Sequence, residues 1–213
     1  LHVGLEGLGL AVRAYQLALD YATERKQGRA VGSPKGESSP IIEHPDVRRM
    51  LMTMKANIEA IRALIYDASA AGDRRNHGAD DAARLGASNR MALLTPVAKA
   101  WATDLGVELT SLGVQIHGGM GFVEETGAAQ YFRDVRVTAI YEGTNGIQAM
   151  DLVGRKLMDG GDAAHALLDE IGMDKKDDEG YRLAPNGEKF EIFIEVKEEA
   201  ADWVRMTELL RAD

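Results

Sequence analysis

The fold class follows from LTPVAKAWATDLGVELTSL, residues Leu94–Leu112 of this chain of 213 residues. The apolar residues of this stretch recur at steps of three and four: Leu94, Ala98, Trp101, Leu105, Leu109 and Leu112. That spacing places them on one face of an α-helix. Pro96 has no amide proton to donate, so we expect it to kink the helix or to restart it at this point.

Two similar patterns precede this helix. The first runs from Leu1 to Leu19 and ends near KQGRAVGSPKGESSP, where glycine, serine and proline predict a loop. The second begins at HPDVRRM, with Pro45 in its first turn, and its apolar face runs from Val47 to Ile65. We expect AAGDRRNHGADD to form the polar connection to the third helix.

Two shorter helical patterns follow, at about Glu125–Phe132 and at about Thr144–Met158. Long helices with a regular apolar face pack into bundles, and no strand pattern alternates with them here. The sequence therefore predicts an all-α fold, an antiparallel four-helix bundle, for a first domain at residues 1–164.

The tail, residues 165–213, has a different pattern. Apolar residues alternate with mostly charged ones over residues 190–197, which predicts a strand, and PNGEK before it predicts a turn. A helix is expected from Ala200. We therefore expect a second unit, a short α/β tail, after the bundle.

Composition excludes several classes of protein. A hydrophobic content of 45% with 28% charged residues is typical of packed soluble domains. The net charge of −9 argues against a broad nucleic-acid surface, which needs clustered lysine and arginine. The absence of cysteine excludes disulfides, zinc–thiolate sites and iron–sulfur clusters. The histidines have no metal-ligand spacing, so no metal site is expected.

The first residues, LHVGLEGLGLAVRAY, carry no targeting signal. They lack the basic start and the cleavage site of a signal peptide, and no apolar run of the chain can span a bilayer. They also lack an initiating Met and look like the inside of a helix, so we expect further sequence upstream. With no cysteine and no export signal, we expect a cytoplasmic protein.

Two motifs around the ends of the long helices carry candidate site residues. QIHGGMGF, Gln115–Phe122, is either a helix C-cap with a tight turn or a place where backbone approaches a ligand closely. Its glycine spacing and the lack of a preceding strand exclude a dinucleotide fingerprint. ATERKQGR, Ala22–Arg29, either stabilises a helix C-terminus or lets Arg25 bind a phosphate.

A third motif, RVTAIYEGTNGIQAMDLVGRKL, contains a single acid, Glu142, between an aromatic residue and a Gly-Thr pair. A carboxylate in a first helical turn is most often a cap or a partner of the helix dipole, and Thr144 is a candidate N-cap. The alternative is a base held against a substrate, with the amides of the turn facing an anionic or polar ligand group. The residues alone leave both interpretations open.

Together, in this order and at these separations, the three motifs resemble the C-terminal helical domain of the acyl-CoA dehydrogenase family. IIEHPDVRRML and LLTPVAKAWATDLGVE add to the resemblance and point to the branch with methylthiopropionyl-CoA dehydrogenase-like enzymes. The resemblance covers roughly Leu1–Asp162. It implies a four-helix bundle that packs against two further domains, with flavin adenine dinucleotide (FAD) at a subunit interface and acyl-CoA along the flavin.

By this resemblance Glu142 is the base that removes the α-proton of the thioester while a hydride passes to the flavin. A carboxylate in a dry pocket, where desolvation raises its pKa, suits this step. Tyr141 and Gly143 would border the acyl chain and the thioester. The hypothesis requires the Glu142 carboxylate to lie near the Gly-rich bend and Arg25 rather than to face bulk water.

The resemblance also implies the contacts with FAD. Arg25 and Gln27 match positions that contact its pyrophosphate or adenine side, often in a neighbouring subunit. Many members have an aromatic residue where this chain has Gly28, so this position departs from the pattern. The remaining implied contacts are with the adenosine part, from Gln115, Ile116, His117, Gly118 and Gly119, and after the base, from Thr144, Asn145 and Gly146.

The implied partners are acyl-CoA as substrate, an electron-transferring flavoprotein as electron acceptor, and further copies of the chain in a homodimer or homotetramer. No nucleic-acid partner is expected. The two further domains of the family supply contacts to the flavin ring and much of the acyl pocket. We therefore expect weak or no flavin binding and no turnover by this chain alone.

The alternative is a non-catalytic helical oligomerisation module, or a fusion fragment with no activity alone. The tail bears on the second possibility, because ALLDEIGMDKKDDEGYRLAPNGEKFEIFIEV resembles a segment of periplasmic peptide-binding proteins of ABC transporters. The chain would then join pieces of two unrelated families near His165. A divergent C-terminal extension is the simpler explanation.

Overall fold

The computed structural model describes residues 1–157 and 161–189. The chain divides into two compact units, Leu1–Ala164 and His165–Asp213. Within the described ranges the regular structure is helical, and β-type pairing is confined to isolated bridges. The all-α class predicted for the bundle is therefore confirmed. The strand expected at residues 190–197 and the helix expected from Ala200 lie outside the described residues.

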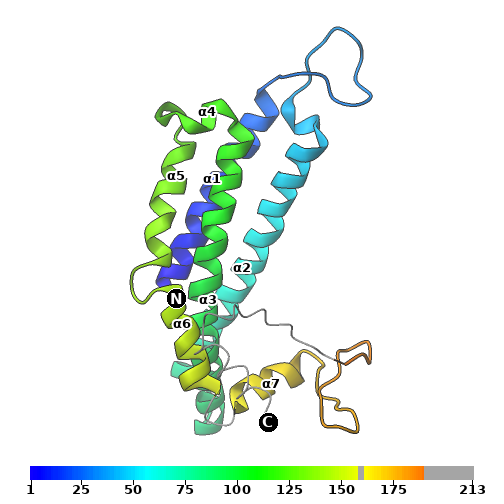
Figure 1. The fold of residues 1–213 in the computed structure, drawn as a ribbon. Helices are drawn as coiled ribbons and strands as arrows, with labels where there is room; N and C mark the ends of the chain where they lie inside the picture. The colour runs from blue at the N-terminus through cyan, green and yellow to red at the C-terminus, as the bar shows by residue number, and fades with distance from the viewer. Residues whose placement is uncertain (158–160, 190–213) are drawn as a thin grey trace, which may run out of the picture. The chain divides into compact units, whose positions relative to one another are not determined.

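Long helices form most of the described part of the first unit: α1 (His2–Glu24), α2 (Pro45–His77) and α3 (Asp81–His117). Helix α3 packs against both α1 and α2, and Figure 1 shows the three running side by side. Helix α1 ends before the loop that glycine and proline predict, and a short 3₁₀ turn, η1 (Ile41–Glu43), precedes α2. Pro45 lies in the first turn of α2, as the sequence predicts.

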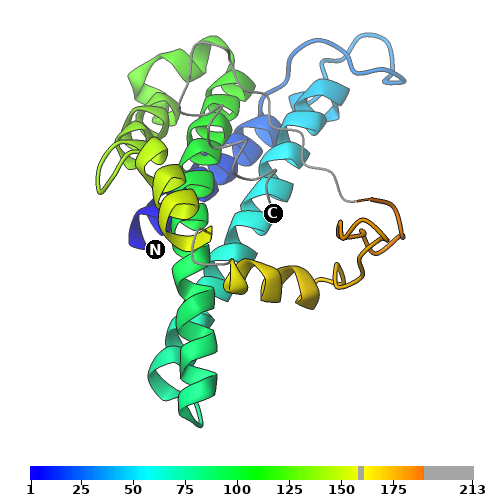
Figure 2. The same cartoon turned by 60° about the horizontal axis from the view of Figure 1, so that its bottom comes forward.

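The connection between α2 and α3 is shorter than the sequence predicts. Helix α2 continues to His77, so most of AAGDRRNHGADD is helical and only residues 78–80 join the two helices, at the tip of the hairpin in Figure 2. Alanines on both helices, Ala71 and Ala87 among them, are buried near this tip. The Asp80 carboxylate caps α3 by accepting a hydrogen bond from the Ala83 amide at 2.7 Å.

The expectation that a helix restarts at Pro96 is wrong, because α3 runs through this residue without a break. Proline in a helix interior removes one hydrogen bond and costs about 3 kcal/mol. The neighbouring Thr95 hydroxyl donates to the Met91 carbonyl at 2.7 Å. Because α3 is packed along both α1 and α2, tertiary contacts outweigh this local cost.

Short segments, rather than one long helix, follow α3. In order they are α4 (Gly119–Phe122), the 3₁₀ turn η2 (Glu124–Thr126), α5 (Ala128–Val135), the 3₁₀ turn η3 (Arg136–Ala139), α6 (Asn145–Asp151) and a π-helical turn, η4 (Leu152–Leu157). Helix α5 packs against α1 and α3, and α6 packs against α3. The two short helices predicted in this region thus exist, with boundaries shifted by a few residues.

The last described helix is α7 (Asp162–Glu170). In the second unit the Arg182 guanidinium donates to the Asp169 carboxylate and, at 2.6 Å, to the Met173 carbonyl. These hydrogen bonds fold the chain after α7 back onto it. The resemblance of the tail to peptide-binding proteins stays a prediction.

The contact between α1 and α3 brings two helix backbones together at glycine. A Cβ placed on Gly7 would meet the Ala102 carbonyl oxygen at 2.8 Å. One placed on Gly106 would meet Val135 Cγ2 at 3.0 Å and the Gly7 carbonyl oxygen at 3.2 Å. Further along α1 the buried residues are also small, namely Ala11, Ala14, Ala18 and Ala22, and a Cβ on Gly113 of α3 would lie 3.4 Å from Ala14 Cβ. Small residues therefore set the α1–α3 distance, since a larger side chain would push the helices apart.

Replacing Gly7 with alanine tests this contact. The added methyl group would press on the Ala102 carbonyl, and we expect Gly7→Ala to lower the free energy of unfolding by about 1–3 kcal/mol, as overpacking does. Gly9→Ala is the matched control, because a Cβ there meets no atom within 4 Å and alanine favours helix. Chemical denaturation measures both variants. A Gly7→Ala protein as stable as the parent would contradict the close packing.

Candidate functional site

Helix α3 ends in a turn that requires glycine. Gly118 follows the helix with φ at +59°, a conformation that residues with a side chain rarely adopt, and its amide donates to the Gln115 carbonyl at 3.0 Å. At Gly121 an added Cβ would lie 2.3 Å from the Val114 carbonyl oxygen. The interpretation of QIHGGMGF as the end of a helix followed by a tight turn is therefore confirmed.

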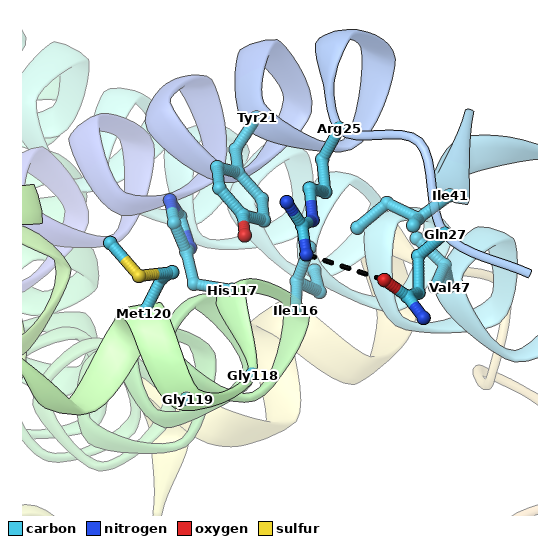
Figure 3. Close-up of a pocket in the computed structure, with 10 residues that line it drawn as sticks. All are labelled: Tyr21, Arg25, Gln27, Ile41, Val47, Ile116, His117, Gly118, Gly119 and Met120. Carbon is cyan, nitrogen blue, oxygen red and sulfur yellow. Dashed lines mark hydrogen bonds between the residues drawn. The ribbon is translucent and has the colours of Figure 1, made fainter.

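A hollow of about 480 Å³, open to solvent, lies beside this turn (Figure 3). Residues from α1 and the segment after it, from η1 and α2, and from the end of α3 and α4 line it: Tyr21, Arg25, Gln27, Ile41, Val47, Ile116, His117, Gly118, Gly119 and Met120. Most of the residues that the sequence assigns to the adenosine side of a cofactor are among them, whereas Gln115 is not. The structure thus brings Arg25 and Gln27 together with the glycine turn.

Several side chains in the hollow are held in place. The Arg25 guanidinium donates to the Gln27 side-chain oxygen at 3.3 Å. The Tyr21 and His117 rings stack with their centroids 4.4 Å apart, and His117 Nδ1 lies 2.7 Å from the Gly113 carbonyl oxygen. An arginine beside flat rings suits a ligand that combines an anionic group with an aromatic base.

Tyr21 and His44 also belong to this region, although the sequence gives no motif that singles them out. Tyr21 lies one helical turn before Arg25, so the four-residue spacing was the available signal. His44 Nε2 lies 2.8 Å from the Gln27 carbonyl oxygen, which fixes the backbone after α1. Gly28 has φ at +63°, and this conformation accounts for a glycine at that position.

Glu142 lies in a bend between η3 and α6. Its φ is +52°, and among the described residues it is the one position other than glycine with a positive φ. Such a conformation costs about 1–3 kcal/mol and persists only where neighbouring contacts hold it. Helix α6 begins at Asn145, so Glu142 precedes its first turn, and the expected position of Glu142 within that turn is wrong. Thr144 takes the N-cap position without a side-chain capping hydrogen bond.

A buried lysine of α3 holds this bend. Lys99 is 4% exposed, and its ammonium donates to the Gly143 carbonyl and to the Asn145 side-chain oxygen, each at 2.8 Å. Burial lowers the pKa of Lys99, and the carboxylates of Asp104 and Glu142 partly offset this shift. Lys99 is not among the residues predicted from the sequence, although a lone lysine between apolar residues of a long helix was the available signal.

Asn145 joins the start of α6 to α3. Its side-chain nitrogen donates to the Thr103 hydroxyl at 3.0 Å and to the Asp104 carboxylate at 2.6 Å, while its oxygen accepts from Lys99. The Gln148 side chain donates, at 3.3 Å, to carbonyls of the bend. The Asn145 amide is thus used by the chain itself, and a cofactor contact by this residue, which stays a prediction, is left to its backbone.

Tyr141 joins the bend to α1. Its hydroxyl donates to the Glu6 carboxylate, and this hydrogen bond is the main reason that the pKa of Tyr141 is raised to about 12. Thr144 and Gly146 are exposed on the same bend. The segment predicted around the base is therefore held to α1 through Tyr141 and to α3 through Gly143 and Asn145.

The bend and the hollow lie far apart in one chain. Along α3, His117 at the hollow follows Lys99 at the bend by 18 residues, a rise of about 27 Å. Figure 1 shows α4 and α6 near opposite ends of this part of α3. The Glu142 side chain is exposed. The expectation that its carboxylate lies near the Gly-rich bend and Arg25 is therefore wrong for a single chain.

Among the described residues, 1–157 and 161–189, no group of three or more His, Cys, Asp or Glu side chains is placed to hold a metal ion. None of their helices has the length and apolar character needed to cross a membrane.

Comparison with known proteins relates this arrangement to one family. The family model described as acyl-CoA dehydrogenase, C-terminal domain, matches residues 1–158. Over 170 residues, 79% of this chain, the sequence is 49% identical to 3-methylmercaptopropionyl-CoA dehydrogenase of Ruegeria pomeroyi. That match covers 29% of the relative, so the chain spans less than a third of its length.

Two solved structures share the helical arrangement. Butyryl-CoA dehydrogenase of Megasphaera elsdenii aligns with a TM-score of 0.56 and 31% identity, over 71% of this chain and 34% of that protein. An acyl-CoA dehydrogenase of Bacillus anthracis, complexed with FAD, aligns with a TM-score of 0.63 and 26% identity, over 84% of this chain and 31% of that protein.

Because of its hydrogen bond to Glu6, Tyr141 should lose its proton at a higher pH than an ordinary tyrosine. With the pKa of Tyr141 raised to about 12, the contribution of this hydrogen bond to folding stability is complete below the usual tyrosine pKa of about 10 and is lost as pH rises through about 12. Glu6→Gln removes the charge and should move the titration back toward about 10. The NMR signal of the Tyr141 ring, assigned by its loss in Tyr141→Phe, measures the shift. A Tyr141 signal unchanged by Glu6→Gln would contradict the pairing.

Proposed function

The chain belongs to the acyl-CoA dehydrogenase family, and from this membership we propose that it supplies the catalytic base for the flavin-dependent α,β-dehydrogenation of an acyl-CoA thioester. One observation supports Glu142 as that base. The bend that carries it has a strained backbone and is held from both sides, by Lys99 and by the Tyr141–Glu6 pair. Proton abstraction requires a carboxylate held in position, and the contacts of this bend hold the backbone from which the Glu142 side chain extends.

In this proposal Glu142 accepts the α-proton, and Tyr141 and Gly143 border the acyl chain and the thioester. FAD, when bound, supplies the acceptor for the hydride that leaves the β-carbon. Thr144, Asn145 and Gly146 contact the cofactor next to the base. Because Glu142 is exposed in this chain, the dry surroundings that favour the step come from other parts of the enzyme.

In this proposal the hollow beside the glycine turn holds the adenosine side of FAD. A Cβ built on Gly118 or Gly119 meets no atom within 4 Å, so the backbone of the turn is open to a ligand. The Arg25 guanidinium offers paired donors to a pyrophosphate, and Gln27 lies beside it. The proposal assigns this role to Arg25, Gln27, Gln115, Ile116, His117, Gly118 and Gly119.

The distance between the bend with Glu142 and the hollow with Arg25 and Gln27 supports a site shared between subunits. In a homodimer or homotetramer, Arg25 and Gln27 of one copy contact the flavin that lies against Glu142 of another. This arrangement reconciles the rise of about 27 Å along α3 with a single reacting centre. The proposed electron acceptor is an electron-transferring flavoprotein, and the proposed location is the cytoplasm.

A second candidate is a non-catalytic helical module that mediates oligomerisation, or a fusion fragment without activity. Two observations favour it: the Glu142 side chain is exposed, and no residue of the hollow lies near it within the chain. The two candidates differ in what Glu142 does, so a variant of this residue separates them.

The chain alone is expected to bind FAD weakly or not at all and to show no turnover. Its hollow is open to solvent, and the proposal places the surroundings of the flavin ring on other domains. Absorbance of the purified chain after addition of FAD and gel filtration measures binding. A stable yellow complex with dehydrogenase activity would contradict this expectation.

Glu142→Gln tests the base in a hybrid enzyme, in which residues 1–158 replace the matching segment of the Ruegeria pomeroyi dehydrogenase. We expect flavin reduction by acyl-CoA to slow by about 10²–10⁴-fold, the usual contribution of a general base, with melting temperature unchanged. Glu125→Gln, at another exposed glutamate, is the matched control. Stopped-flow bleaching of the flavin gives the rate, and equal rates for Glu142→Gln and the parent hybrid would favour the non-catalytic module.

A further inference from the structure

We propose that Lys99 is a positioning residue: its ammonium fixes the bend that carries Glu142 and so sets where the carboxylate lies. The inference rests on the proposed role of Glu142 as the base. The contacts that support it are independent of any ligand, because all of them lie within this chain.

The ammonium of Lys99 meets the bend at two points. Its donors reach the carbonyl of Gly143, the residue directly after Glu142, and the side chain of Asn145, each at 2.8 Å. An ammonium has three donors and no acceptor, so both hydrogen bonds are unambiguous in direction. Together they fix the segment in which Glu142 adopts its positive φ.

The position of Lys99 leaves the bend as the place where its charge is satisfied. The backbone of α1 covers α3 here, since a Cβ on Gly4 would lie 3.0 Å from the Ala98 carbonyl oxygen and 3.6 Å from Lys99 Cα. Burying a charge is costly unless partners compensate it. Lys99 is therefore not a solvated surface lysine that meets the bend by chance.

The partner of Lys99 is itself oriented. Asn145 lies between Lys99, which can only donate, and the Asp104 carboxylate, which can only accept, so its amide oxygen must face the ammonium. The Thr103 hydroxyl, one turn after Lys99, lies 3.0 Å from the Asn145 nitrogen. A network in which every hydrogen-bonding group has a partner holds a single geometry. A catalytic base depends on such a fixed geometry.

Cleavage of the Glu142–Gly143 bond by a glutamate-specific protease tests the inference in the 213-residue chain. Lys99→Met keeps an unbranched side chain but removes the donors, and we expect cleavage after Glu142 to rise at least about tenfold, as loss of a charge-assisted hydrogen bond implies. Cleavage after Glu37, an exposed residue of the loop before α2, should stay constant. Lys55→Met, at an exposed lysine of α2, is the matched control.

Asn145→Ala breaks the same contact from the other side and should give the same local rise, which keeps the test decisive if Lys99→Met does not fold. Lys99→Arg, which keeps the charge, should restore part of the protection. Unchanged cleavage after Glu142 in Asn145→Ala or Lys99→Met would overturn the inference. An equal increase of cleavage after Glu142 and after Glu24, at the end of α1, would also overturn the inference. It would show that Lys99 contributes only to the general stability of the chain.

The hybrid enzyme separates this inference from the proposed function. There Lys99→Met should lower kcat by about 10- to 100-fold with little change in KM, because a displaced base slows the chemical step and not binding. A changed KM with kcat intact would overturn the positioning role. A parent hybrid without activity would overturn the proposed function instead, and the proteolysis would still decide whether Lys99 holds the bend.

Discussion

The close contact between α1 and α3 is the constraint on which both the bend with Glu142 and the hollow beside the glycine turn depend. Gly7 and Gly106 allow the two backbones to touch, and Val135 of α5 packs on Gly106 at the same place. The chain after α5 therefore starts from a fixed point and reaches α3 again at the bend with Glu142. The hollow at the other end of the pair is likewise framed by the ends of α1 and α3.

The same contact buries Lys99, so that its ammonium must bind to other parts of the chain. Where α1 lies against α3, Lys99 is shut off from water and must find its partners in the bend. The cost of burying its charge is compensated by two hydrogen bonds and by the nearby Asp104 and Glu142 carboxylates. Near its middle, helix α3 thus holds the separate bend that carries Glu142, and the open hollow lies at its end.

The sequence predicted most of the helical framework because the apolar spacing of long helices is a local property. It failed where local signals oppose tertiary packing. Pro96 is a helix breaker by itself, yet α3 continues through it because both neighbouring helices support it. The polar run before His77 reads as a loop, yet its small residues, such as Ala71, are buried in the α2–α3 hairpin.

The sequence by itself determined the all-α class, the glycine turn at the end of α3 and Glu142 as the acid between an aromatic residue and a Gly-Thr pair. Each of these features depends on residues that are close together in the sequence. Only the tertiary structure decided which motifs meet. It placed Arg25 and Gln27 with the glycine turn, separated them from Glu142, and brought Lys99 to the bend from 43 residues before Glu142. The physical reason is that side-chain contacts across helices depend on how closely backbones approach, and no single stretch of sequence encodes that distance.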